Sequence, residues 1–72
     1  MIRYLLETTR KSRGMKQSEL AKFSGVSKSM ISAIERQERN PTVPVLYLLS
    51  KALHVEITEL FQKEKVWDEE PD

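Results

Sequence analysis

Two short helical patterns meet at a glycine in the first half of the chain, and this junction restricts the possible folds more than any other feature. Residues 17–24 ("QSELAKFS") and residues 28–36 ("KSMISAIER") both place apolar side chains at helical spacing. Ser27 is well placed as the N-cap of the second helix. Two helices joined by so short a turn approach closely at the corner. Ala21 is small enough for such an approach, and Gly25 tolerates a positive φ at the turn.

The other positions of this segment carry the residues that such a corner needs. Counted from Gln17, the small residues stand at the fifth and ninth positions. Large apolar residues stand at the fourth, tenth, fifteenth and eighteenth positions: Leu20, Val26, Ile31 and Ile34. The six positions together predict a helix-turn-helix with its own small apolar cluster.

Three further helices are expected outside this segment. Residues 2–12 show helical spacing and end at Gly14, where the last turn is basic. Residues 43–53 form the most apolar pattern, with Thr42 as N-cap, and residues 56–62 ("EITELFQ") form a short last helix. No segment shows convincing period-2 alternation, so we expect no sheet. The predicted fold class is all-α, a compact five-helix bundle.

The composition limits the class of protein. A chain of 72 residues forms one domain at most. It has no cysteine, which removes disulfides and thiolate metal sites. No apolar run approaches the ~20 residues that a membrane span needs, and the N-terminus lacks the apolar segment of a signal peptide. We therefore expect a soluble cytoplasmic protein without a membrane partner.

The sequence offers little for catalysis or cofactor binding. His54, the one histidine, is expected at a helix end, and the chain has no glycine-rich phosphate loop or convergent acid–base pair. A bundle of this size also leaves little room for a ligand cavity. We expect no enzyme activity, no metal, no cofactor and no small-molecule ligand.

The charges are unevenly distributed. Residues 1–40 contain nine Lys and Arg and four Glu, a net charge of +5. Residues 41–72 contain three Lys and seven Asp and Glu, a net charge of −4. A basic first half favours a polyanionic partner, most simply nucleic acid. Charge alone leaves an ordinary solvated surface equally open.

The segment "MKQSELAKFSGVSKSMISAIERQERNPTVPVLYLLSKALHVEITELF" resembles the lambda-repressor-like family of DNA-binding domains, of the Xre/Cro type. The resemblance covers residues 2 to about 62, which places a DNA-binding domain at 1–62 and an acidic C-terminal tail at 63–72. It implies that the helix over about 28–36 is a recognition helix in the major groove of double-stranded DNA.

The resemblance places base contacts at the start of the recognition helix. Lys28 and Ser29 would lie deepest in the groove, with Ser32 and Ala33 one turn further on, and Ser27 is also expected to bind DNA. Lysine can donate to guanine O6 and N7, serine pairs with several base edges, and the alanine methyl fits a thymine methyl. The alternative for the serines and Ala33 is a helix surface without base contact.

Phosphate contacts are implied on both sides of this helix. Gln17 stands where the family holds a phosphate at a helix N-terminus. Lys16 replaces the family's usual capping residue and adds a cation. Arg36, Arg39 and Asn40 resemble a second phosphate clamp. An uncommitted surface glutamine remains the alternative for Gln17.

Arg10 and Glu35 match a family pair that links the first helix to the end of the recognition helix. A glutamate beside DNA would repel phosphates, so a fixed cationic partner is expected. Such a pair would fix orientation more than it adds stability. The alternative is two exposed charges.

Three positions depart from the family or lie beyond it. Gln37 and His54 stand where the family usually has glycine, so a retained positive φ would carry strain at Gln37, and His54 is expected to end a helix. Trp67 lies in the tail. It could pack on its own bundle, anchor a dimer or partner, or be disordered.

We expect a sequence-specific transcriptional regulator, a repressor, that binds a palindromic operator as a homodimer. Four apolar residues exceed what a small core needs and are the expected dimer surface: Val45, Tyr47, Ile57 and Phe61. The alternative is a protein-interaction module, such as an antitoxin or a bridging coactivator, that uses the acidic tail with Trp67. The two functions are compatible.

Overall fold

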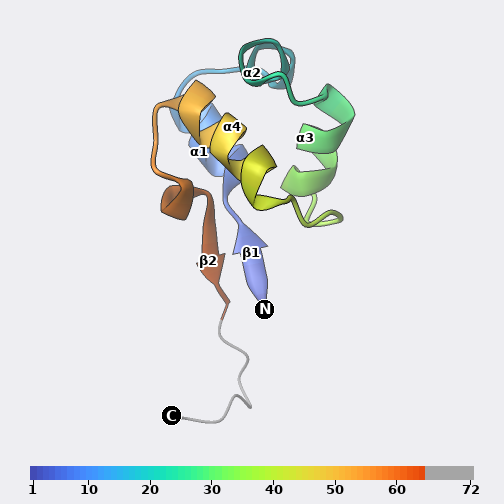
Figure 1. Ribbon diagram of the computed structural model, residues 1–72, viewed down its shortest axis with the longest axis vertical. Helices are drawn as coiled ribbons and strands as arrows, with labels where there is room; N and C mark the ends of the chain where they lie inside the picture. The colour runs from blue at the N-terminus through green and yellow to red at the C-terminus, as the bar shows by residue number, and fades with distance from the viewer. Residues whose placement is uncertain (65–72) are drawn as a thin grey trace, which may run out of the picture.

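The computed structural model describes residues 1–64, so Trp67 and most of the acidic tail lie outside the described residues. The described chain is mostly helical, with two strands that extend from one end of the helical bundle (Figure 1). The elements in chain order are β1 (Ile2–Tyr4), α1 (Leu6–Ser12), α2 (Gln17–Ser24), α3 (Lys28–Glu35), α4 (Val43–Leu53), the 3-10 helix η1 (Ile57–Leu60) and β2 (Phe61–Lys63). None of the helices in this part of the chain is long and apolar enough to cross a membrane.

The N-terminal residues form a strand, so the expectation of a helix over 2–12 is wrong at its start. β1 pairs antiparallel with β2, with Ile2 opposite Lys63 and Tyr4 opposite Phe61. The Leu5 N–H donates to the Leu60 carbonyl at 2.7 Å and closes the sheet against the bundle. α1 begins only at the next residue. A two-stranded sheet between distant segments replaces the sheet-free, all-α architecture that local periodicity indicates.

The end of the described chain also differs from the expectation, because it pairs with β1 at the other end of the chain. Instead of a helix over 56–62, one 3-10 turn is followed at once by β2. The Glu59 carboxylate accepts from the Glu56 N–H at 2.8 Å and fixes that turn. β2 includes Lys63, so the folded unit extends one residue beyond the predicted boundary at 62. The five-helix bundle is therefore four α-helices, one 3-10 helix and a small sheet.

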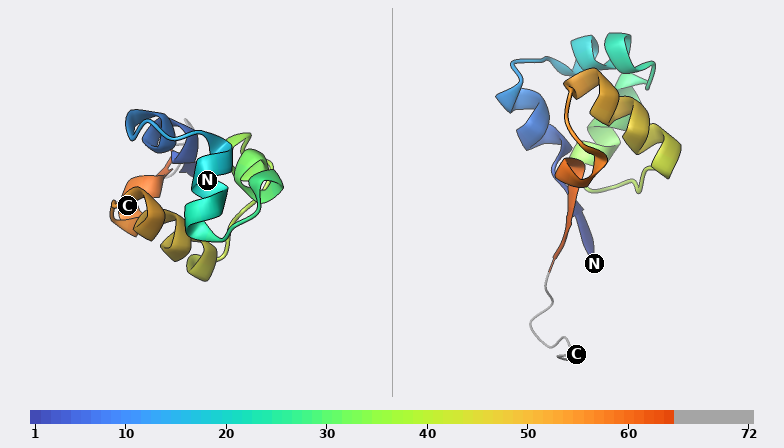
Figure 2. Two further views of the ribbon diagram at one scale, coloured as in Figure 1. Left: turned by 90° about the horizontal axis from the view of Figure 1, so that it is seen from above. Right: turned by 60° about the vertical axis from the view of Figure 1, so that its left-hand side comes forward.

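The core lies between the helices and contains the apolar residues that the corner spacing indicates. Leu20, Val26, Ile31 and Ile34 are all buried. They pack with apolar side chains from the other helices: Leu6, Leu46, Leu49, Leu53 and Leu60. Ala21 is half-buried against this cluster. Figure 2 shows that α2 lies at the end of the bundle opposite the strands.

Backbone conformation and caps account for the helix boundaries. Gly25 has a φ of +78°, and a Cβ there would meet no atom within 4 Å, so conformation and not space requires the glycine. The Ser27 hydroxyl accepts from the Met30 N–H at 3.1 Å, and the Thr42 hydroxyl accepts from the Val45 N–H at 3.3 Å. His54 ends α4 with a φ of 57°. These predicted caps are confirmed.

A buried ion pair joins α1 to α3, as predicted. Arg10 Nε donates to Glu35 Oε2 at 2.6 Å, and Arg10 Nη2 donates to Glu35 Oε1 at 3.1 Å. The Arg10 and Glu35 side chains are only 9% and 4% exposed. Arg10 Nη1 also donates to the Met15 carbonyl at 2.7 Å, which fixes the chain between α1 and α2. The hydrogen bond to Glu35 raises the pKa of Arg10 above its ordinary value, so this guanidinium remains charged throughout the neutral range.

Removal of one partner of this pair should be strongly destabilising. We expect Arg10→Met to lower the free energy of unfolding by about 3–5 kcal/mol, because the buried Glu35 carboxylate loses its countercharge. Urea denaturation followed by circular dichroism measures the loss. The double variant Arg10→Met/Glu35→Leu should recover most of it, because no buried charge remains uncompensated. A single variant within about 1 kcal/mol of the wild type would contradict this account.

Candidate nucleic-acid interface

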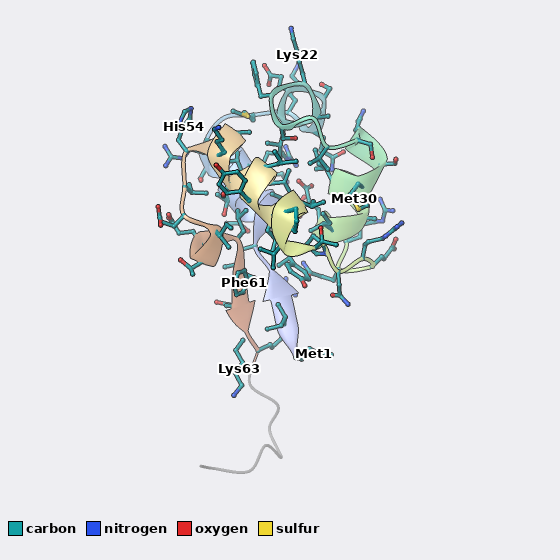
Figure 3. All side chains as sticks on the ribbon, viewed as in Figure 1. Met1, Lys22, Met30, His54, Phe61 and Lys63 are labelled. Atoms are coloured by element: carbon teal, nitrogen blue, oxygen red, sulfur yellow. The ribbon has the colours of Figure 1, made fainter. Side chains whose placement is uncertain are left out.

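α3 has one buried face and one outward face. Ile31 and Ile34 point into the core and are fully buried. On the other face, Lys28 and Ser29 are exposed, and Ser32 and Ala33 are half-exposed. Figure 3 shows Met30 and the neighbouring side chains of α3 along one flank of the molecule. Every residue predicted to contact bases is therefore accessible on one helix surface.

The N-terminus of α3 is well ordered by its cap. The Ser27 hydroxyl accepts from the Met30 N–H and lies 3.5 Å from the Ser29 hydroxyl. The Ser27 oxygen is thus used by the predicted N-cap, which leaves the hydroxyl hydrogen as its donor for a DNA contact. The cap fixes the first turn of α3, so that Lys28 and Ser29 lie at the N-terminal end of its outward face.

The C-terminal end of α3 carries a cation with several partners. Arg36 donates from Nη1 to the Ser32 hydroxyl and forms an ion pair with Glu38, with Nη2 and Oε1 3.1 Å apart. The hydrogen bond to Glu38 raises the pKa of Arg36. The guanidinium is thus held along the same face as Ser32. Glu38 offsets part of its charge, a feature that the sequence prediction missed.

Gln17 lies at the start of α2 and directly contacts α3. Its Nε2 donates to Glu35 Oε1 at 2.8 Å, so the carboxylate of the buried ion pair also orients this side chain. Lys16 is exposed at the N-cap position. Its side chain accepts no capping bond, and Glu19 instead accepts from the Lys16 backbone N–H at 2.8 Å. The predicted loss of a side-chain cap at Lys16 is thus partly compensated.

Arg39 and Asn40 lie in the exposed loop that follows α3. The structure gives neither side chain a hydrogen bond within residues 1–64. The same loop contains Gln37, with a φ of 62°. The predicted positive φ at Gln37 is confirmed, whereas its hydrogen bonds to Tyr4 of β1, at 2.9 and 2.8 Å, had no signal in the sequence, because β1 itself was not predicted.

The electrostatics of this surface follow from the ion pairs. α3 contains one carboxylate, Glu35, and Arg10 neutralises it. Lys28 and Arg39 have no carboxylate partner among the described residues. The outward face of α3 and the loop after it therefore present positive charge and hydrogen-bond donors, which suit a phosphate backbone and base edges.

The described residues contain no group of three or more His, Cys, Asp or Glu side chains that could hold a metal ion. They do form an open recess of about 580 Å³ between α2 and α4, lined by residues that include Phe23, Leu48 and His54. The recess is open to solvent and does not enclose a ligand-sized volume, so the expectation that the bundle has little room for a ligand cavity stays a prediction. The recess lies away from α3.

Known proteins resemble this chain in sequence and structure. The sequence model of a helix-turn-helix family matches residues 6–60. The transcriptional regulator SlrR of Bacillus subtilis is 46% identical over 65 residues, which are 89% of this chain and 43% of SlrR. The chain thus spans less than half the length of that relative.

Two solved structures share the fold. The restriction-modification controller protein C.AhdI of Aeromonas hydrophila has a TM-score of 0.72 at 33% identity, covering 75% of this chain and 82% of C.AhdI. The controller protein C.Esp1396I, a tetramer in complex with its natural 35 base-pair operator, has a TM-score of 0.70 at 36% identity, covering 76% of each chain. The chain therefore belongs to the helix-turn-helix family of lambda-repressor-like, Xre/Cro-type proteins.

Proposed function

We propose that this protein is a transcriptional regulator that binds double-stranded DNA in a sequence-specific manner, with α3 in the major groove. The observation that carries the proposal is the outward face of α3, which exposes Lys28 and Ser29 while its one carboxylate is neutralised from behind by Arg10. The names of the relatives support it: SlrR is a transcriptional regulator, and C.Esp1396I is bound to its operator.

The proposed contacts divide into base readout and phosphate binding. Lys28, Ser29, Ser32 and Ala33 read base edges, and these short side chains give modest discrimination at each position. Phosphates are held by Gln17 and Lys16 on one side of α3, and by Arg36, Arg39 and Asn40 on the other. Gln17 still has a second Nε2 hydrogen for a phosphate after its bond to Glu35.

We propose a homodimer as the DNA-binding form. One short recognition helix reads too few bases, and two copies about 34 Å apart would read a palindrome across successive turns of DNA. The proposed dimer surface lies on α4, η1 and the start of β2. Tyr47 is 52% exposed there, and Val45, Ile57 and Phe61 are half-buried. A dimer seated on a promoter would exclude other proteins, so repression is the proposed mode.

DNA binding is tested by fluorescence anisotropy with an operator selected from a random duplex pool and with a scrambled duplex. We expect selective binding, and a log–log salt slope of about −0.9 for each phosphate contact. Lys28→Ala should reduce the binding free energy for the selected operator by about 1–3 kcal/mol and relax the sequence preference of the protein. Arg39→Ala should weaken binding to both duplexes and reduce the magnitude of the salt slope by about 1.

Lys11→Ala is the control for loss of one positive charge, because Lys11 is exposed, forms its ion pair with Glu7 within α1, and is not among the proposed DNA contacts. Equal losses for Lys11→Ala and Lys28→Ala on the selected operator would contradict a base contact at Lys28. Equal affinity of the wild type for both duplexes at all salt concentrations would contradict sequence-specific binding.

Dimer formation is tested by analytical ultracentrifugation of Tyr47→Glu. We expect its dimer dissociation constant to rise at least about tenfold, because two like charges would face each other across a two-fold axis. Phe23→Glu is the control, since Phe23 is 63% exposed on α2, outside the proposed surface. Dimers of unchanged stability for Tyr47→Glu would rule out this surface.

A further inference from the structure

The side chain of Gln37 binds the backbone of β1 at two points. Its Oε1 accepts from the Tyr4 N–H at 2.9 Å, and its Nε2 donates to the Tyr4 carbonyl at 2.8 Å. Gln37 and Tyr4 are 33 residues apart in the sequence. One carboxamide therefore satisfies both polar backbone groups of one strand residue.

The register of the sheet shows which edge this carboxamide occupies. The Leu5 N–H donates to the Leu60 carbonyl, and the Glu64 N–H donates to the Met1 carbonyl. Backbone groups alternate between the two edges of an antiparallel strand. Those of Tyr4 therefore point away from β2, to the outer edge of β1. The carboxamide of Gln37 takes the place that a third strand would have there.

The backbone of Gln37 makes this contact at some conformational cost. With a φ of 62° it is one of two non-glycine residues in the left-handed region within residues 1–64, and the other is His54. Such a conformation persists where surrounding contacts hold it. At Gln37 the backbone cap of α3 supplies part of these contacts, because the Gln37 N–H donates to the Ile34 carbonyl at 3.0 Å and the Glu38 N–H donates to the Ala33 carbonyl at 2.9 Å. The two side-chain bonds to Tyr4 add to this cap. The His54 side chain has no hydrogen bond within the described residues, which makes His54 a comparison position.

Gln37 begins the loop that carries the proposed phosphate contacts. Arg36 precedes it, and Arg39 and Asn40 follow two and three residues later. Asn40 and Gln37 line an open recess of about 620 Å³ together with residues of β1. The loop therefore rests beside the outer edge of β1 (Figure 1), and the bond to Tyr4 is where the two are joined.

We propose that Gln37 is a positioning residue that couples the β1–β2 sheet to DNA binding by holding the loop after α3 against β1. This inference rests on the proposed DNA-binding function. Removal of the link would leave α3 and its base contacts in place, and would release Arg39 and Asn40 from their phosphates.

The test variant is Gln37→Asn. Asparagine keeps the carboxamide and tolerates a positive φ better than glutamine, but it is one methylene too short to reach Tyr4. Hydrogen exchange measured by NMR should show the Tyr4 amide exchanging about tenfold faster or more. Operator affinity should fall about fivefold, with the ratio between selected and scrambled duplexes unchanged, because phosphate contacts carry no sequence information. The urea midpoint should stay near that of the wild type.

A double-mutant cycle separates positioning from general stability. If Gln37 acts through Arg39, then Arg39→Ala should cost less in the Gln37→Asn background than in the wild type. His54→Asn is the matched control, because it relieves the same backbone strain without touching β1, and its operator affinity should match the wild type.

Faster Tyr4 exchange with unchanged operator affinity would overturn the coupling, as would full additivity with Arg39→Ala. Unchanged Tyr4 exchange would show that the link does not hold in solution. If the wild type binds no duplex, the proposed DNA-binding function fails and the coupling with it. The exchange experiment, which needs no DNA, then still reports on the link itself.

Discussion

The buried pair of Arg10 and Glu35 fixes the relative positions of the first three helices. Arg10 comes from α1 and also donates to the Met15 carbonyl just before α2. Glu35, at the end of α3, accepts from Gln17 at the start of α2 as well. Helices of seven and eight residues are too short to be stable alone. Their orientation has to come from tertiary contacts, and this network supplies directional ones that apolar packing cannot.

The small sheet joins the two ends of the described chain, because β1 precedes the first helix and β2 follows the last one. A three-residue, two-stranded sheet has little stability of its own. Here Tyr4 and Phe61 pack against the core from opposite strands, and the Leu5–Leu60 hydrogen bond continues the pairing into the bundle. The two ends of residues 1–64 are thus held by the same helices that they flank. The sheet therefore depends on the helical bundle for its stability.

Local signals were sufficient for the middle of the chain and insufficient for its ends. α2 and α4 match their predicted bounds, and α3 ends one residue early, because caps at Ser27 and Thr42 and apolar spacing act within one or two turns. β1 could not be predicted, because three residues carry no periodicity and their partners lie about sixty positions away. Because β1 was not predicted, the bond between Gln37 and Tyr4 was not predicted either, although the positive φ at Gln37 was expected.

Some features of the site could be predicted from the sequence pattern, some only from resemblance to the family, and some not at all. The accessible face of α3 follows from periodicity, since Ile31 and Ile34 define the opposite side. The pairing of Arg10 with Glu35 came from resemblance to the family, because spacing alone does not show that residues 25 positions apart meet. The bond between Gln17 and Glu35 and the pair of Arg36 with Glu38 depend on side-chain geometry that only the folded chain supplies.

The placement of the carboxylates decides where the basic half of the chain is effective. Three of the four glutamates in residues 1–40 form ion pairs, with Arg10, Lys11 and Arg36. The fourth, Glu19, is bound to the Lys16 backbone. All four carboxylates are thus engaged locally, and six cations of this half have no carboxylate partner in the described chain: Arg3, Arg13, Lys16, Lys22, Lys28 and Arg39. Three of the six stand near the recognition helix: Lys16 precedes α2, Lys28 begins α3 and Arg39 follows α3. The net charge of +5 over this half is therefore only partly placed around the proposed recognition helix. What favours DNA there is that the carboxylates near α3, Glu35 and Glu38, are each held by an arginine, so that Lys28 and Arg39 are not offset by them.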